Sequence, residues 1–211
     1  MSVVSDPAHP AVAWPQDAQY GSATPGKLGM WIFLLSDWFS FAGLLIAYGI
    51  LRGGSAVWRH PGEPALNIPF TAVLTAILLA SSVAMLRAQD AARRQDRART
   101  SIWLALTALG GILFLTGQFQ EWIGIWHPGL MKEGLVFGRS AYASTFYSIT
   151  GFHGLHVTIG VIYLLVTLGR NLRRPVRAGA VELAGLFWHF VDLVWNLVFA
   201  LVYLIPQGAG S

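Results

Sequence analysis

The sequence predicts an all-α integral membrane protein, a bundle of five transmembrane helices with the N-terminus cytoplasmic and the C-terminus outside. Only 11% of the 211 residues are charged and 55% are hydrophobic, whereas soluble domains carry about 25% charged residues. The mean hydropathy is +0.54. In addition, the basic residues are distributed unevenly between the segments that connect the apolar stretches, and this sets the orientation.

Five apolar stretches each supply the roughly 20 helical residues that one crossing of the hydrocarbon needs. They are continuous apolar runs without a period of two, which favours helices over a β-barrel. The chain shows no internal repeat, so we expect one transmembrane domain over residues 27–206, a flexible tail over 1–26 and a short tail over 207–211. The stretches cover residues 28–51, 68–86, 102–119, 142–168 and 183–205.

Arginine is concentrated in two of the four connecting segments, after the second stretch and after the fourth. By the positive-inside rule these two segments face the cytoplasm. The other two segments hold only Arg52 and Arg59, then Lys132 and Arg139. The nine arginines are Arg87, Arg93, Arg94, Arg97, Arg99, Arg170, Arg173, Arg174 and Arg177.

The composition also excludes several functions. The chain has no cysteine, which rules out disulfides, zinc–thiolate sites, iron–sulfur clusters and thiol nucleophiles. A net charge of +4 and a pI near 9.8 would suit a nucleic-acid partner, but the basic residues lie in short loops between apolar stretches. We therefore expect no nucleic acid.

Ionisable groups inside the apolar stretches are the candidate functional residues, because they are costly in the bilayer and normally face protein or water. Asp37 lies about nine residues into the first stretch, roughly 13 Å along a helix. It is a candidate proton-accepting carboxylate, and the alternative is a carboxyl that only packs against a neighbouring helix.

The last two stretches carry paired polar residues at helical spacing. His153 and His156 lie in TGFHGLHV, and His189, Asp192 and Asn196 lie in WHFVDLVWN. Residues three or four apart share a helix face, so one buried hydrogen-bonded network between the two helices is the favoured interpretation. Axial ligation of haem and a His–carboxylate metal site remain open as alternatives.

Two of these motifs resemble a known family. FYSITGFHGLHVTIG (146–160) and VELAGLFWHFVDLVW (181–195) resemble subunit III of the haem–copper respiratory oxidases. The first stretch, with an acidic residue after serine, and GQFQEW (117–122) are similar to further segments of that family. The resemblance covers residues 27–205.

The resemblance implies a five-helix form of subunit III. Such a chain is a non-catalytic part of a cytochrome c oxidase, in which O2 reduction drives proton pumping. It holds no haem or copper, because these belong to subunits I and II. The implied partners are those two subunits, possible small subunits or a respiratory supercomplex, and membrane lipids including bound phospholipid. The implied location is the bacterial cytoplasmic (inner) membrane, as a multi-pass protein.

The resemblance also implies roles for residues. Asp37, beside Ser36, falls where cytochrome c oxidase members usually carry glutamate, and we expect it to support proton uptake. The arginines at the cytoplasmic rim are candidate ligands for lipid headgroups, with topology control alone as the alternative. The structural polar network comprises His153, His156, Glu182, His189, Asp192 and Asn196, and the headgroup candidates are Arg87, Arg93, Arg94, Arg170 and Arg173.

Other functions stay open beside this one. The chain is alternatively subunit III of a quinol oxidase, or a subunit III-like protein of a nitric oxide reductase. A stand-alone membrane cytochrome would place haem on the histidines. A proton-coupled transporter is disfavoured, because the chain lacks the repeat that such proteins commonly show.

Overall fold

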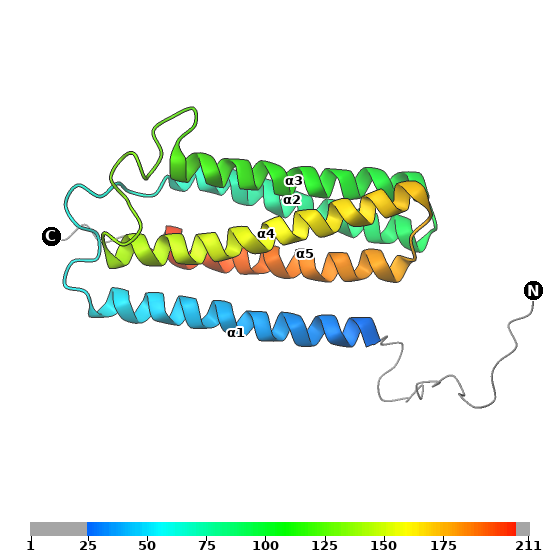
Figure 1. The fold of residues 1–211 in the computed structure, drawn as a ribbon, viewed down its shortest axis with the longest axis horizontal. Helices are drawn as coiled ribbons and strands as arrows, with labels where there is room; N and C mark the ends of the chain where they lie inside the picture. Colours follow the sequence, from blue (N-terminus) through cyan, green and yellow to red (C-terminus); the bar gives the residue numbers. More distant parts are fainter. Residues whose placement is uncertain (1–24, 206–211) are drawn as a thin grey trace, which may run out of the picture.

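The computed structural model describes residues 25–205, which form five long helices and a final short one (Figure 1). Each of the five helical spans is long and apolar enough to cross a membrane, so the predicted all-α membrane fold is confirmed. Apart from residues 25 and 26, the predicted tails lie outside the described residues. The helices are α1 (Pro25–Gly54), α2 (Ile68–Arg93), α3 (Arg97–Ile123), α4 (Ala141–Arg173) and α5 (Ala178–Val198), followed by the π-helix η1 (Phe199–Leu204).

Four of the helices form a closed bundle and the fifth lies beside it. α2 and α3 form an antiparallel hairpin, α3 packs on α4, α4 on α5, and α5 returns to α2. α1 lies outside this bundle, against α4 and α5 (Figure 1). The connections 55–67 and 124–140 lie at one end, here called the long-loop end, and the connections 94–96 and 174–177 lie at the other, the arginine-rich end.

Polar side chains fix the starts of three helices, where backbone N–H groups lack intrahelical partners. Asn67 accepts a hydrogen bond from the Phe70 N–H before α2, Asp96 from the Arg99 N–H before α3, and Ser140 from the Ala143 N–H before α4. The Asp96 cap lets α3 begin directly after the short connection 94–96, whereas α5 begins after residues 174–177 without a side-chain cap.

Two tryptophans of α5 hold the core of the bundle. Trp188 and Trp195 are fully buried, and a buried indole N–H needs a partner. The Trp188 Nε1 donates to Ser81 Oγ at 3.1 Å and the Trp195 Nε1 to Thr75 Oγ1 at 2.9 Å. Both acceptors belong to α2, so these bonds join α5 to α2 in the apolar interior.

Candidate functional site

A buried carboxyl and a buried imidazole meet where α1 crosses α4. Asp37 Oδ1 lies 3.1 Å from His156 Nε2, and both side chains are 9% exposed. Apolar rings surround the pair: Phe41 and Phe152 pack on the imidazole with centroid distances of 5.2 and 4.6 Å. The second carboxyl oxygen, Asp37 Oδ2, is buried and has no hydrogen-bond partner among the described residues.

The geometry of His156 defines how many protons this pair holds. Its Nδ1 lies 2.8 Å from the carbonyl oxygen of Phe152, and a carbonyl oxygen can only accept, so Nδ1 carries a hydrogen. The contact between Nε2 and Asp37 Oδ1 then needs one further proton. Either the carboxyl is protonated and donates to Nε2, or the imidazolium donates to the carboxylate. The pair therefore holds one exchangeable proton inside the membrane.

The neighbouring predicted residues do not join this pair. Ser36 is exposed, and its hydroxyl donates to the Ile32 carbonyl oxygen at 2.9 Å. His153 is fully buried between Phe114 and Trp195, at centroid distances of 5.7 and 4.8 Å. Neither of its ring nitrogens has a hydrogen-bond partner in the described part of the chain. Its ring therefore packs as an aromatic group.

The predicted polar residues of α5 lie away from the Asp37–His156 pair. His189 Nδ1 is 3.1 Å from Ser82 Oγ of α2, whereas Asp192 Oδ1 is buried and has no hydrogen-bond partner among the described residues. The Asn196 amide donates to the backbone oxygen of Asp192 at 2.9 Å. His189 therefore connects α5 to α2, the Asn196 bond lies within α5, and His156 connects α4 to α1.

Glu182 lies apart from both groups, near the arginine-rich end. Its Oε1 is 2.9 Å from Lys27 Nζ of α1 and 3.8 Å from Arg93 Nη2 of α2. This carboxylate therefore joins three helices through ion pairs.

The arginines gather at the arginine-rich end with different partners. Arg94 pairs with Asp90 at 3.1 Å, within α2. Arg97 donates to the carbonyl oxygens of Asn171 and Leu172 and so caps the end of α4. A surface hollow of about 820 Å³ follows α4. Its lining includes the four arginines Arg170, Arg173, Arg174 and Arg177.

Glu121 is a buried carboxyl that the sequence prediction did not single out. Its Oε1 accepts from Thr71 Oγ1 at 3.0 Å, and its Oε2 accepts from Gln118 Nε2 and from the Tyr203 hydroxyl, both at 2.9 Å. The predicted third stretch ends at residue 119, so it left Glu121 in a loop, whereas α3 continues to Ile123. The available signal was the spacing of Gln118 and Glu121, three apart on one helix face.

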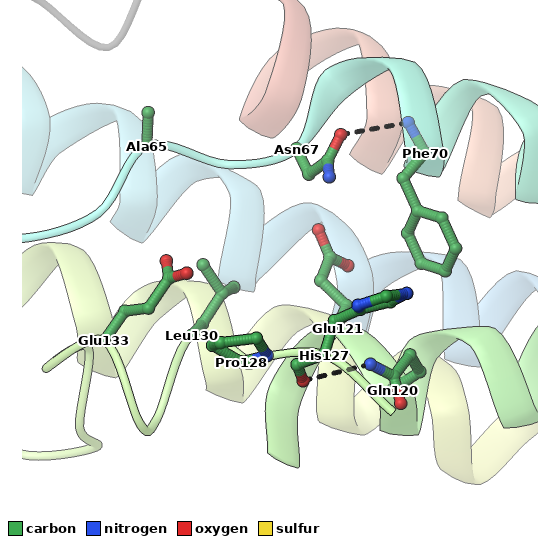
Figure 2. Close-up of a pocket in the computed structure, with 9 residues that line it drawn as sticks. All are labelled: Ala65, Asn67, Phe70, Gln120, Glu121, His127, Pro128, Leu130 and Glu133. Carbon is green, nitrogen blue, oxygen red and sulfur yellow. Dashed lines mark hydrogen bonds between the residues drawn. The ribbon is translucent and has the colours of Figure 1, made fainter. Parts of the chain in front are cut away.

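A pocket of about 310 Å³ lies beside Glu121 at the long-loop end (Figure 2). Asn67 and Phe70 at the start of α2 line one side, and the segment with His127 and Pro128 lines the other. The Gln120 side chain orders that segment, because its amide donates to the His127 carbonyl oxygen at 3.2 Å (Figure 2). Its Oε1 also accepts the N–H groups of residues 125 and 126 at 2.7 and 2.9 Å.

The described residues hold no group of three or more His, Cys, Asp or Glu side chains that could bind a metal ion. The buried ionisable residues are instead distributed over separate helix contacts. Asp37 and His156 can hold a proton between them, and the other ionisable residues link neighbouring helices.

Comparison with known proteins decides the family. The family model described as "Cytochrome c oxidase subunit III" matches residues 22–207. The chain belongs to this family. It is 40% identical to cytochrome c oxidase subunit 3 of Synechocystis sp. over 84% of this chain and 74% of the relative. The corresponding protein of Thermostichus vulcanus is 35% identical over 85% and 87%.

A quinol oxidase subunit is also a relative of this subunit III chain. It is 32% identical to the cytochrome bo(3) ubiquinol oxidase subunit 3 of Pseudomonas aeruginosa, over 92% of this chain and 91% of the relative. The predicted family is thus confirmed. As a subunit III, the chain is a non-catalytic member of a membrane oxidoreductase complex, associates with other oxidase subunits, and belongs to a family that carries no haem or copper.

Proposed function

We propose that this subunit III serves a terminal haem–copper oxidase of a bacterial cytoplasmic membrane that takes electrons from cytochrome c and reduces O2. Haem and copper would reside in the partner subunits I and II. Family membership and the two cytochrome c oxidase relatives named above support this proposal. The contribution of this chain is to assist proton delivery and to stabilise the complex.

The observation that carries the proton role is the Asp37–His156 contact of 3.1 Å. A carboxyl and an imidazole that share one proton can accept a proton from one side and release it to the other. The Phe41 and Phe152 rings contact the imidazole, and both of its nitrogens already have partners. Because exchange must then pass through Asp37, the unpartnered Oδ2 is the entry point on this chain. Ser36 takes no part through hydrogen bonding to Asp37, and its hydroxyl lies on the outer surface of α1.

The test replaces Asp37 in the assembled oxidase. Asp37→Asn retains the side-chain volume but cannot exchange a proton, and Asp37→Ala removes the group. We expect both variants to show slower proton uptake and fewer turnovers before inactivation, measured by a pH-indicator dye in reconstituted vesicles and by oxygen consumption. Asp90→Asn, at an exposed carboxylate paired with Arg94, is the matched control. Wild-type uptake and turnover number in Asp37→Asn would disprove the proton role.

The arginine-rich end is proposed to bind anionic phospholipid headgroups. Each basic residue near an anionic surface contributes about 1 kcal/mol. Arg170 and Arg173 line the hollow after α4 and Arg87 is exposed on α2, whereas Arg93 and Arg94 also pair with carboxylates. The double variant Arg170→Gln and Arg173→Gln should retain less phosphatidylglycerol, as measured by mass spectrometry of lipid that copurifies with the oxidase.

A quinol donor is the second candidate. The relative in Pseudomonas aeruginosa, named as a ubiquinol oxidase subunit, favours it. The presence of a dicopper centre in the purified complex would assign cytochrome c as the donor, and oxidation of quinol by a complex without that centre would assign quinol.

A further inference from the structure

Two hollows flank the outward face of α4 near its middle. One lies between α1 and α4, has a volume of about 650 Å³, and is lined by Ser40 and Leu44 of α1. The other lies between α3 and α4 and has a volume of about 150 Å³. Gly151 and Leu155 line both hollows, so the two form one recessed surface on either side of the Leu155 side chain.

Small residues make this part of α4 accessible to a second helix. A Cβ atom added at Gly154 would meet nothing within 4 Å, and one at Gly151 would meet only the Trp122 ring, at 3.5 Å. Ser148 and Thr158 continue the same face. Transmembrane helices associate closely through such small residues, because lipid offers no hydrophobic driving force between them.

Two polar atoms beneath the smaller hollow lack partners. Gln118 is 3% exposed, and its amide nitrogen is used in the bond to Glu121, which leaves Oε1 without a partner among the described residues. The buried Nε1 of Trp122 also has none. Both residues line the hollow. An unsatisfied polar group at membrane depth costs several kcal/mol.

The two orphan atoms have complementary character. Gln118 Oε1 is an acceptor and Trp122 Nε1 is a donor. A hydroxyl or carboxamide side chain both donates and accepts, so it suits this pair, whereas a lipid acyl chain does neither. Because both atoms are buried, the incoming group must approach closely, and the missing side chains at Gly151 and Gly154 leave room for it.

We propose that this face of α4 is the docking site for a transmembrane helix of another oxidase subunit, which inserts a hydroxyl or carboxamide side chain beside Gln118 and Trp122. The inference rests on the proposed function, in which this chain acts within an oxidase complex. A neighbouring subunit then contacts this chain at the recessed surface of α4.

The first test fills the recessed surface. Gly154→Leu places a bulky side chain in the hollow, and Gly169→Leu is the matched control on the same helix, because a Cβ atom there also meets nothing within 4 Å. We expect tagged Gly154→Leu chain to copurify with roughly tenfold less of the other oxidase subunits than wild type, and Gly169→Leu to copurify normally. Equal copurification of both variants would overturn the proposal.

The second test identifies the occupant and does not depend on how the variant folds. Because the chain contains no cysteine, a benzophenone maleimide can be attached at Leu155→Cys in the assembled oxidase, with Leu165→Cys as the control outside the hollows. We expect photolysis to join Leu155→Cys to a different oxidase subunit and Leu165→Cys to lipid. Adducts of Leu155→Cys with lipid alone, or with a second copy of this chain, would overturn the proposal.

These outcomes are separable from those of the Asp37 test. Proton uptake is measured on complexes that have assembled, whereas docking is measured as assembly and crosslinking. If docking failed at this face, the result for Asp37 would stand, and the reverse also holds.

Discussion

Glu121 joins three helices through a single side chain. Its two oxygens accept hydrogen bonds from Thr71 of α2, Gln118 of α3 and Tyr203 of η1. Glu121→Leu removes both acceptor oxygens and leaves the Gln118 and Tyr203 donors without them. Because a buried donor without its acceptor costs about 1–3 kcal/mol, we expect a loss of that size. A lower thermal unfolding midpoint of the purified oxidase would report it.

The exposed Glu133, which lines the pocket beside Glu121, supplies the matched control for this prediction. Glu133→Leu removes a carboxyl group without removing a buried hydrogen bond, so it should retain the wild-type midpoint. If Glu121→Leu also retained that midpoint, the bonds of Glu121 would not contribute measurably to stability.

Asp37 and His156 show what residue patterns can and cannot predict. Each is an ionisable group inside an apolar stretch, and this alone marked both as candidates. Their pairing was not predictable, because spacing relates residues within one helix and the contact joins α1 to α4. The sequence pattern instead suggested a single network of α4 and α5. In the structure His156 contacts α1 and His189 contacts α2, whereas His153 packs between rings of α3 and α5.

At the scale of helices, the Trp188 ring sets how closely three of them approach. A Cβ atom at Gly111 of α3 would lie 2.5 Å from the Trp188 ring and 2.6 Å from Val161 of α4. One at Gly160 of α4 would lie 3.0 Å from the same ring. The indole therefore fills the space that these two glycines leave between α3, α4 and α5.

Gly111→Val should overpack this contact. We expect a destabilisation of about 1–3 kcal/mol, seen as a lower thermal midpoint in detergent. Gly169→Val makes the same substitution where a Cβ atom has open space, and its midpoint should stay near wild type. Equal midpoints for the two variants would contradict the close packing of Trp188.

The number and order of the helices followed from the sequence, because about 20 continuous apolar residues specify a span whatever its neighbours are. The helix ends did not, since hydropathy detects the hydrocarbon-facing part and caps such as Asp96 lie beyond it. Hydropathy also gives no indication that α5 changes to a π-helix at Phe199. This change matters for stability, because the π-helix carries the Tyr203 that donates to Glu121.

For the whole molecule, α1 is the helix least enclosed by the others. It lies outside the four-helix bundle (Figure 1). The Lys27–Glu182 ion pair connects it to the bundle near the arginine-rich end, and the Asp37–His156 contact connects it further along the helix. The proposed proton pair therefore lies buried at the contact between the bundle and its least enclosed helix. This placement is consistent with a chain that assists chemistry performed elsewhere in the complex.

The orientation of the whole molecule remains a prediction from its arginines. In the structure the two connections beside which the nine arginines lie are at one end, and the two long loops are at the other (Figure 1). By the positive-inside rule the arginine-rich end faces the cytoplasm. The absence of cysteine allows a direct measurement with Arg174→Cys and Glu133→Cys, which lie at opposite ends and are both exposed.

A membrane-impermeant maleimide distinguishes the two orientations. In spheroplasts, whose cytoplasmic membrane is intact, we expect Glu133→Cys to be labelled and Arg174→Cys to be protected, because only the long-loop end faces outward. Inside-out vesicles should give the opposite pattern, which also shows that each thiol can react. Labelling of Arg174→Cys in spheroplasts would reverse the orientation and place the arginines away from the cytoplasmic leaflet. The proposed binding of anionic headgroups at that leaflet would then fail with it, whereas the Asp37–His156 contact would be unaffected.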